Sequence, residues 1–268
     1  MKKWITLLLS LAPLTLFAES FNLDYLEKIK DPYTKGVAII TFLYSSNFGF
    51  HDETVDVTMI LKDRSGRQST RYFQRKYLED PEGDRTANIF DRPRDVKGTG
   101  ILTISHGVDD DDVWIYLPVV KRVKRISSHN QSGPFMGSEF AYEEISAWEI
   151  EKRSYKYLRD EVFNGHDCFV VETVPLYKNS GYTKQVEWID KTILRPRKIV
   201  FYDRKKTLLK TLEYGNYRQY LGQYWRTHEV FITNHQNGKS TQALFKNYRF
   251  RTGLTRRDFT KTSLKRAR

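Results

Sequence analysis

The sequence is poor in residues that build covalent or metal-centred sites. Its 268 residues include a single cysteine, Cys168, so no disulfide can form within the chain. Cys168 lies in an alternating apolar stretch, as expected for a buried structural thiol rather than a reactive one. The six histidines show no i, i+4 pair and are not accompanied by a set of cysteines, which argues against a zinc site. We therefore expect no metal and no cofactor.

Catalytic motifs are lacking as well. There is no Gly-x-Ser-x-Gly, and Gly98-Thr99-Gly100 precedes a predicted strand instead of a helix, so it does not form a phosphate cradle. The acids Asp109 to Asp112 lack the ligand spacing of a calcium loop and favour a solvated hairpin. A glycosidase pair of carboxylates stays open, because acids are scattered over many predicted strands. We expect a binding protein, not an enzyme.

Long apolar runs are confined to the N-terminus. Lys2 and Lys3 precede an apolar run over residues 4–17, which is too short to span a bilayer comfortably, and Ala18 follows it. The pattern predicts a signal peptide over residues 1–18, cleaved near Ala18. An uncleaved anchor is the alternative. Residues 19–268 are then an exported chain, which we expect to form a single β domain.

Acidic residues are outnumbered by basic ones, 33 to 45. For an exported protein this favours lipid head groups, anionic glycolipid or acidic proteins as partners over nucleic acid, although simple solubility is the alternative. Four cations lie close together and are candidates for contact with an anionic surface: Lys121, Arg122, Lys124 and Arg125. The segment of residues 249–268 is also basic, and we expect either an extended arm or a solvated end.

Strand-like alternation fills most of the chain. Residues 55–62 alternate as a strand with one buried face, and Val37 to Tyr44 is apolar on both faces, which predicts a strand covered on both sides. Further strands are predicted over residues 68–78, 86–90, 101–105, 113–117, 121–126, 155–163, 167–174, 184–189, 197–203, 208–214, 224–233 and 240–249. Helix signals are limited to residues 22–30 and to short turns within residues 138–150.

Short turns between consecutive strands predict antiparallel neighbours, and the lack of βαβ alternation argues against a parallel sheet. We expect a mainly β fold in which one meander is strongly curved or closed into most of a barrel. A two-sheet sandwich is the competing fold. Phe135 and Met136 stand out because they lie on a Gly/Pro/Ser loop, where they either cover an apolar cavity or plug the protein's own core.

Two segments carry a resemblance to a known family: DDVWIYLPVVKRVKRISS (residues 111–128) and GPFMGSEFAYEEI (residues 133–145). They resemble the signature of the outer-membrane lipoprotein-sorting proteins, a branch similar to the LolA-type periplasmic carriers. The resemblance extends over nearly the whole mature chain. It implies a curved, incomplete antiparallel β-barrel whose open side is covered by a few short helices as a lid over an apolar cavity.

The resemblance also implies a role, namely holding lipid or the acyl chains of lipoproteins and carrying them through the periplasm, with an RND/MMPL-type inner-membrane transporter as partner. The arginine that locks the lid of the classical carrier matches no definite residue of this sequence. The candidate ligand-binding residues of the cavity and lid are Trp114, Tyr116, Phe135, Met136, Phe140, Tyr142 and Trp148.

Three glutamates of the lid segment, Glu139, Glu143 and Glu144, are expected to pair with the cations of the preceding strand, with exposed ion pairs weak enough to open. The alternative function is a non-carrying accessory module. It would dock on a transporter or on the anionic envelope surface through its basic patches.

Overall fold

The computed structural model describes residues 23–146 and 149–266. The predicted signal peptide and Trp148 lie outside the described residues. The helices are α1 (Leu23–Lys28), α2 (Pro32–Ser45), α3 (Tyr142–Ile145) and α4 (Lys261–Arg266). The strands are β1 (Asp52–Lys62), β2 (Gln68–Leu78), β3 (Arg85–Arg92), β4 (Gly100–Ile104), β5 (Asp112–Leu117), β6 (Arg122–Ile126), β7 (Arg153–Phe163), β8 (His166–Pro175), β9 (Tyr182–Asp190), β10 (Arg195–Asp203), β11 (Leu208–Gly215), β12 (Arg218–Tyr220), β13 (Tyr224–Arg226), β14 (Glu229–Asn234) and β15 (Ser240–Phe250).

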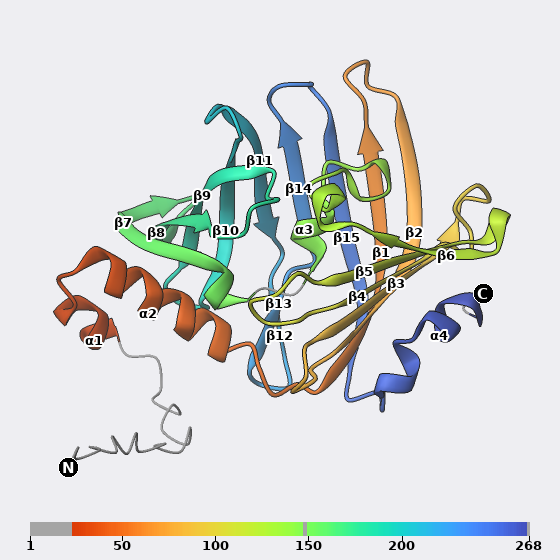
Figure 1. Ribbon diagram of the computed structural model, residues 1–268. Helices are drawn as coiled ribbons and strands as arrows, with labels where there is room; N and C mark the ends of the chain where they lie inside the picture. The colour runs from red at the N-terminus through yellow and green to blue at the C-terminus, as the bar shows by residue number, and fades with distance from the viewer. Residues whose placement is uncertain (1–22, 147–148, 267–268) are drawn as a thin grey trace, which may run out of the picture.

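Thirteen strands form one antiparallel sheet in the order β6-β5-β4-β3-β2-β1-β15-β14-β11-β10-β9-β8-β7, while β12 and β13 form a separate ribbon. The sheet is not closed, because β6 and β7 lie at its two opposite edges. Strand direction turns from steep in β14 and β15 to nearly horizontal in β4 to β6, so the sheet curls around a concave face (Figure 1). The prediction of a mainly β, curved and incomplete barrel is confirmed.

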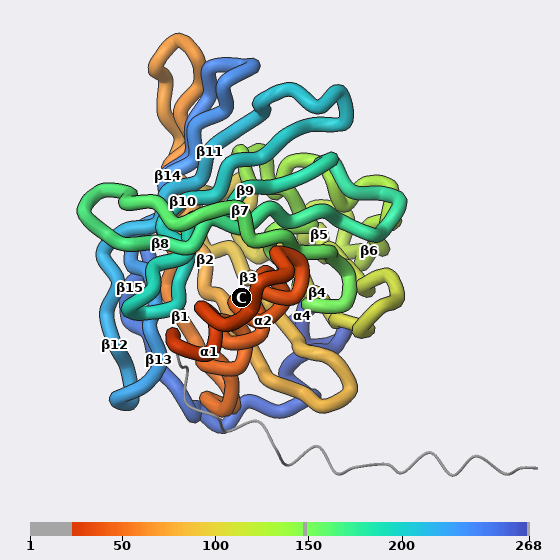
Figure 2. Tube along the Cα trace, turned by 90° about the vertical axis from the view of Figure 1, so that its left-hand side faces the viewer, coloured from red at the N-terminus to blue at the C-terminus, as the bar shows by residue number. Residues whose placement is uncertain are grey.

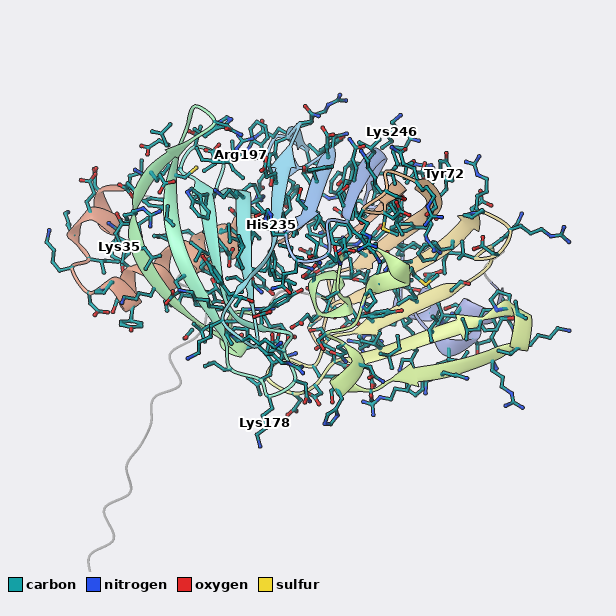
Figure 3. The ribbon with its side chains drawn as sticks, turned by 90° about the horizontal axis from the view of Figure 1, so that it is seen from above. Lys35, Tyr72, Lys178, Arg197, His235 and Lys246 are labelled. Atoms are coloured by element: carbon teal, nitrogen blue, oxygen red, sulfur yellow. The ribbon has the colours of Figure 1, made fainter. Side chains whose placement is uncertain are left out.

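Alternation in β1 shows why the concave face is the core. Val55, Val57 and Met59 are at most 3% exposed, and Val57 lies opposite Phe73 of β2 and Phe245 of β15. Residues of the other parity point outward from the convex face, as Tyr72 of β2 and Lys246 of β15 do in Figure 3. Irregularities in several strand pairs, among them β1–β15 and β2–β3, accompany the bend of the sheet.

The strand predicted for Val37 to Tyr44 is wrong, because these residues belong to α2. Asp31 caps this helix by accepting a hydrogen bond from the Thr34 amide, and Pro32 occupies its first turn. A segment that is apolar at nearly every position has no period, so it fits a strand and a buried helix equally well. The N-cap residue Asp31 and the following Pro32 are the local features that favour the helix here.

Helices α1 and α2 pack on the concave face at the β7 end of the sheet. Figure 2 shows them below β7 and β8, and Ile39 and Ile40 of α2 join a buried cluster with Tyr155 and Phe169. Gly36 brings the helix against the backbone of β7, where a Cβ atom would lie 2.8 Å from the Tyr157 nitrogen. The helix therefore lies directly on the backbone of the edge strand β7.

The strand predicted over residues 224–233 is interrupted. Tyr224–Arg226 pairs with β12, and the main sheet resumes only at Glu229. Between them the Thr227 hydroxyl hydrogen-bonds the Gly215 and Glu229 carbonyls, which takes backbone acceptors out of the ladder. The helical turns predicted over residues 138–150 are confirmed as α3 and a 3₁₀ turn that begins at Ile150.

One connection spans the two edges of the open sheet. β6 and β7 are consecutive in the chain, so residues 127–152 must pass from one edge to the other. This segment is called the lid below. Its described residues, 127–146 and 149–152, contain α3 and three 3₁₀ turns, and α3 lies in front of β14 and β15 in Figure 1. The sheet topology thus places the lid over the concave face.

The basic C-terminal segment is folded over its described residues. After β15, a 3₁₀ turn at Arg256–Asp258 leads into α4, and Phe259 and Leu264 are buried against Ala87 and Leu102 on the convex side. Arg256 forms ion pairs with Asp80 and Glu82. Among the described residues, no helix is long and apolar enough to cross a membrane.

Candidate functional site

A cavity of about 370 Å³ lies between the concave face and the lid. The end of α2 and the β12–β13 ribbon complete its wall. Its apolar lining comprises Leu43, Phe48, Phe50, Val57, Met59, Phe73, Phe135, Phe140, Ile145, Pro196, Trp225, Val230, Ala243 and Phe245. The volume falls within the roughly 300–1,000 Å³ typical of small-molecule sites, and the lining suits a ligand with a large apolar part.

Four of the candidate residues come together at this cavity. Phe135 and Phe140 line it, and Met136 and Tyr142 pack against the same apolar cluster. The Phe135 ring is 1% exposed and lies 6.2 Å from Phe73 and 5.5 Å from Tyr142 between ring centroids. Phe135 therefore serves both purposes considered for it, because it fills the core beneath the lid and forms part of the cavity wall.

Trp114 and Tyr116 lie elsewhere. They belong to the cluster beneath α4 on the convex side, and the Lys261 ammonium lies 3.3 Å from the centroid of the Trp114 ring. Strand alternation explains this position: Val113 and Ile115 pack into the concave core, so Trp114 and Tyr116 must point the other way. The alternation of side chains along β5 is visible in the sequence, and it correctly predicts that Trp114 and Tyr116 face away from the core that contains Val113 and Ile115.

The four basic candidates lie at and beside the edge strand β6. Lys121, Arg122, Lys124 and Arg125 are all exposed, and Arg125 forms an ion pair of 2.6 Å with Asp112. Exposed cations on an edge strand oppose pairing with a second chain, which is a structural use that needs no ligand. The adjoining tip is more unusual, because Val119 is 90% and Val120 50% exposed.

The lid glutamates do not pair with β6, so that part of the sequence-based hypothesis is wrong. Glu144 pairs with Lys210 of β11, Glu143 accepts hydrogen bonds from Tyr177, Ser180 and the Gly181 amide, and Glu139 accepts from Asn234. All these partners belong to the half of the sheet that ends at β7. The lid has to cross the concave face before α3 begins, which brings its glutamates to the far side.

Burial shapes the ionisation of these lid contacts. Burial raises the pKa of Glu143, and Tyr177, Ser180 and the Gly181 amide offset part of the effect by donating to it. Burial, together with the neighbouring Glu144, also raises the pKa of Tyr182 well above its usual value. Tyr182 donates a hydrogen bond to Glu144 as a neutral phenol. The lid is thus fixed by a network of buried polar groups.

Sequence reasoning missed the charged groups of the cavity. Arg75, Arg195 and Arg226 line it together with Glu53 and Glu144. The available signal was again parity: Arg71 and Arg75 alternate in phase with Phe73, whose side chain is in the core. Arginines on the core side of a strand predict either buried ion pairs or a polar subsite.

Two of these cavity charges pair directly. The Arg226 Nε lies 2.7 Å from Glu53 Oε2, and both side chains are about nine-tenths buried. Arg195 is 6% exposed and donates to uncharged oxygens, among them the Leu43 carbonyl and Ser46 Oγ at the end of α2. Burial, followed by the nearby Arg226, lowers the pKa of Arg195 to about 10, so it remains charged at neutral pH. The carbonyl end of α2 favours this cation.

The described part of the chain also forms hollows outside this cavity, among them two with charged linings. A polar groove of about 620 Å³ runs along the outer side of the lid past Arg204, Lys205 and Lys239, and an acidic hollow of about 380 Å³ lies near Asp84 and Glu149. Within residues 23–146 and 149–266, no group of three or more His, Cys, Asp or Glu side chains is arranged to hold a metal ion.

Comparison with known proteins gives a consistent set of relatives. A family model with the description "-like: Uncharacterized protein" matches residues 82–266. No curated protein matches the chain. A solved domain from Vibrio parahaemolyticus, named as an outer membrane lipoprotein-sorting protein, is 53% identical with a TM-score of 0.85, and the match covers 87% of this chain and 99% of that one.

Two further solved structures are similar. A DUF1329 family protein from Desulfovibrio piger is 28% identical with a TM-score of 0.83, and the match covers 87% of this chain and 99% of that one. A LolA superfamily protein from Nitrosomonas europaea is 21% identical with a TM-score of 0.68, covering 84% of this chain and 97% of that one. At this level of identity the last comparison concerns the fold alone.

Proposed function

We propose a function from one premise, that the chain belongs to the family of outer membrane lipoprotein-sorting proteins and has a LolA-like fold. The protein is a carrier that holds lipid, or the acyl chains of a lipoprotein, in the cavity beneath the lid. The observation that supports this is the apolar lining of that cavity, to which both the sheet and the lid contribute. Its chemistry is binding and release instead of catalysis.

The cargo-binding residues in this proposal are Phe135, Met136, Phe140 and Tyr142, with Val57 and Val230 on the sheet side. Burying an acyl chain against apolar side chains lowers the free energy by about 25 cal/mol per Å² of apolar surface removed from water, and it needs no directional contacts. A carrier also has to release its cargo. Release requires the lid to move, because lid residues from Phe135 to Ser146 form one wall of the cavity.

We further propose that residues 1–18 are removed as a signal peptide and that residues 19–268 act in the periplasm as one unit. The name of the Vibrio parahaemolyticus relative agrees with this location. An RND/MMPL-type inner-membrane transporter is the proposed partner that supplies the cargo, on the basis of the signature in residues 111–145.

Contact with an anionic membrane surface is proposed for the tip of the β5–β6 hairpin. Val119 and Val120 protrude there, and the exposed Lys121, Arg122 and Lys124 follow directly. Apolar side chains beside exposed cations match an interface of acyl chains beneath anionic head groups. The same surface would serve the second candidate function, an accessory module that docks without carrying lipid.

The experiment that tests carriage is native mass spectrometry of residues 19–268, purified from a periplasm without detergent, with lipid analysis of an organic extract. Ala243 lines the cavity and is 2% exposed, so Ala243→Phe should fill the space and remove the bound lipid. Val162→Phe, at a position that is 68% exposed, is the matched control. A protein that stays lipid-free even after incubation with membrane lipids would favour the accessory module.

A further inference from the structure

The cavity has an uncompensated positive charge in its wall. Of its three arginines, Arg226 is balanced by Glu53. Glu144, the other acid of the lining, is already paired with Lys210. Among the described residues, Arg75 and Arg195 form no ion pair. The hydrogen-bond acceptors of Arg195 are uncharged oxygens at the end of α2 and the carbonyls of Leu194 and Trp225. Arg75 is the cation without an assigned structural partner.

The surroundings of Arg75 indicate a donor site. Its Nε atom is buried and has no hydrogen-bond partner within the described part of the chain, and the same is true of the Nδ2 atom of Asn88. Arg75 and Asn88 are directly opposed on β2 and β3, and both line the cavity. Asn88 is only 1% exposed. Two unsatisfied donors therefore lie side by side on the same wall.

Unsatisfied buried donors are costly, and native structures normally give them partners. No carboxylate of the described residues pairs with Arg75, whose guanidinium carbon lies 5.8 Å from the centroid of the Tyr77 ring. A guanidinium beside an amide NH₂ offers several N–H groups, a combination that suits the two or three oxygens of a carboxylate or phosphate. Arg195 adds a second positive charge to the field of the same cavity.

Resting on the proposed carrier function, we infer that the cavity selects an anionic amphiphile, with its charged head at Arg75 and Asn88 and its acyl chain among Phe73, Phe135 and Phe140. The shared chemistry is one anionic oxygen group on a long apolar chain. A fatty-acid carboxylate and a lipid phosphate both satisfy it. An uncharged lipid would leave the two donors unpaired.

The test compares ligands that differ only in the head. Oleate is matched with oleyl alcohol, and 1-oleoyl lysophosphatidate with monoolein, each by displacement of the neutral fluorophore Nile red at pH 8. We expect the charged member of at least one pair to bind about tenfold more tightly, as for a hydrogen bond to a charged group. Which pair shows the preference distinguishes a carboxylate from a phosphate head.

Variants locate the preference. Arg75→Gln and Asn88→Leu should each reduce the charged-to-neutral affinity ratio toward one while affinity for oleyl alcohol persists, and Arg75→Lys should keep part of it. Arg64→Gln, in the exposed turn between β1 and β2, is the matched control. Thermal unfolding of Arg75→Gln checks the fold, and we expect no loss of stability, because the variant removes a charge that has no counter-ion.

The outcomes separate the two proposals. Equal affinity for charged and neutral members of both pairs would overturn the anion site and leave the carrier intact. A preference that survives both Arg75→Gln and Asn88→Leu would overturn the assignment of the head to these residues. No binding of any of the four probes would reject carriage itself, and the anion site with it.

Discussion

Lys210 of β11 and Glu144 of α3 form a buried ion pair that ties the lid to the sheet. The Nζ–Oε1 distance is 2.6 Å, and the side chains are 4% and 9% exposed. Lys210 also donates to the Glu139 carbonyl at 2.6 Å, so one ammonium holds two points of the lid. Because the lid forms a wall of the cavity, this contact should link the stability of the fold to the retention of a ligand in the proposed carrier.

Replacing one partner of this pair should destabilise the protein strongly. Lys210→Met leaves the Glu144 carboxylate buried without its counter-ion, and we expect the free energy of unfolding to fall by about 3–5 kcal/mol. Urea unfolding measures this, and hydrogen exchange over residues 138–146 should rise. The exposed pair Arg159–Glu161 supplies the control, since Arg159→Gln should cost roughly 0–1 kcal/mol. Similar losses in the two variants would refute the role of Lys210 as the lid anchor.

The close approach of α2 to β7 makes Gly36 sensitive to a single added carbon. Gly36→Ala raises helix propensity by about 1 kcal/mol, but its Cβ would lie within 3.0 Å of backbone atoms of Lys156 and Tyr157. Because backbone atoms cannot yield as a flexible side chain would, we expect the clash to prevail and the melting temperature to fall. Thermal unfolding tests this, with Val37→Ala, at a 44% exposed position of the same helix, as the control.

The same substitution should also affect the ligand. Leu43 and Tyr44 at the end of α2 line the cavity, so a displaced helix opens its wall. We expect faster exchange of a bound lipid in Gly36→Ala than in Val37→Ala. A Gly36→Ala protein that melts at or above the wild-type temperature would contradict the prediction, because it would show that α2 can move away from β7 without loss of stability.

Glu187 should make stability depend on pH. It is buried on β9, where Thr173 donates a hydrogen bond of 2.6 Å to it, and burial raises its pKa above the ordinary 4.5. A raised pKa in the folded state means that its stabilising contribution is complete below pH 4.5 and is lost as the pH rises through the folded-state value. Glu187→Gln removes this loss and keeps an oxygen to accept from Thr173.

We therefore expect the stability advantage of Glu187→Gln over the wild type to grow as the pH rises from 4 to 8. Urea unfolding at several pH values measures it, and the exposed Glu213→Gln is the control. A difference between Glu187→Gln and the wild type that stays constant from pH 4 to 8 would contradict the prediction, since it would place the effect in packing instead of ionisation.

Local sequence signals predicted most of the strands, because alternation and short turns are properties of a few neighbouring residues. The predicted strand over residues 68–78 coincides with β2. The signals failed where neighbours do not decide the structure. Val37 to Tyr44 has no period, and its helical state depends on the cap at Asp31 and on a docking surface that only the folded sheet provides.

The candidate site was predictable only in part for the same reason. The unusual apolar residues of the lid, Phe135 and Phe140, indicated the cavity, whereas Trp114 was misplaced because its aromatic character was given more weight than the parity of β5. Lys210, the partner of Glu144, and Asn88, the neighbour of Arg75, lie on other strands, and sequence spacing does not contain that information. Strand order, which brings them together, follows from the whole chain.

The last prediction concerns membrane binding by the tip of the β5–β6 hairpin. Pro118 lies against the β3–β4 loop, where a Cβ on Gly98 would be 3.3 Å from its ring, and the exposed Lys97 precedes Gly98 in that loop. Each cation near an anionic surface contributes about 1 kcal/mol. The triple variant with glutamine at Lys121, Arg122 and Lys124 should therefore bind phosphatidylglycerol vesicles roughly 100-fold more weakly at low salt.

A matched triple variant separates this local surface from net charge. Lys178, Lys205 and Lys239 are exposed at other hairpins, and Lys178 points away from the body of the molecule in Figure 3. Replacing these three with glutamine changes the net charge equally but should leave vesicle binding nearly intact. Val119→Ser should weaken binding at high salt as well, because apolar insertion is not screened. Equal losses in the two triple variants would assign the attraction to overall charge and remove the hairpin tip as the docking surface.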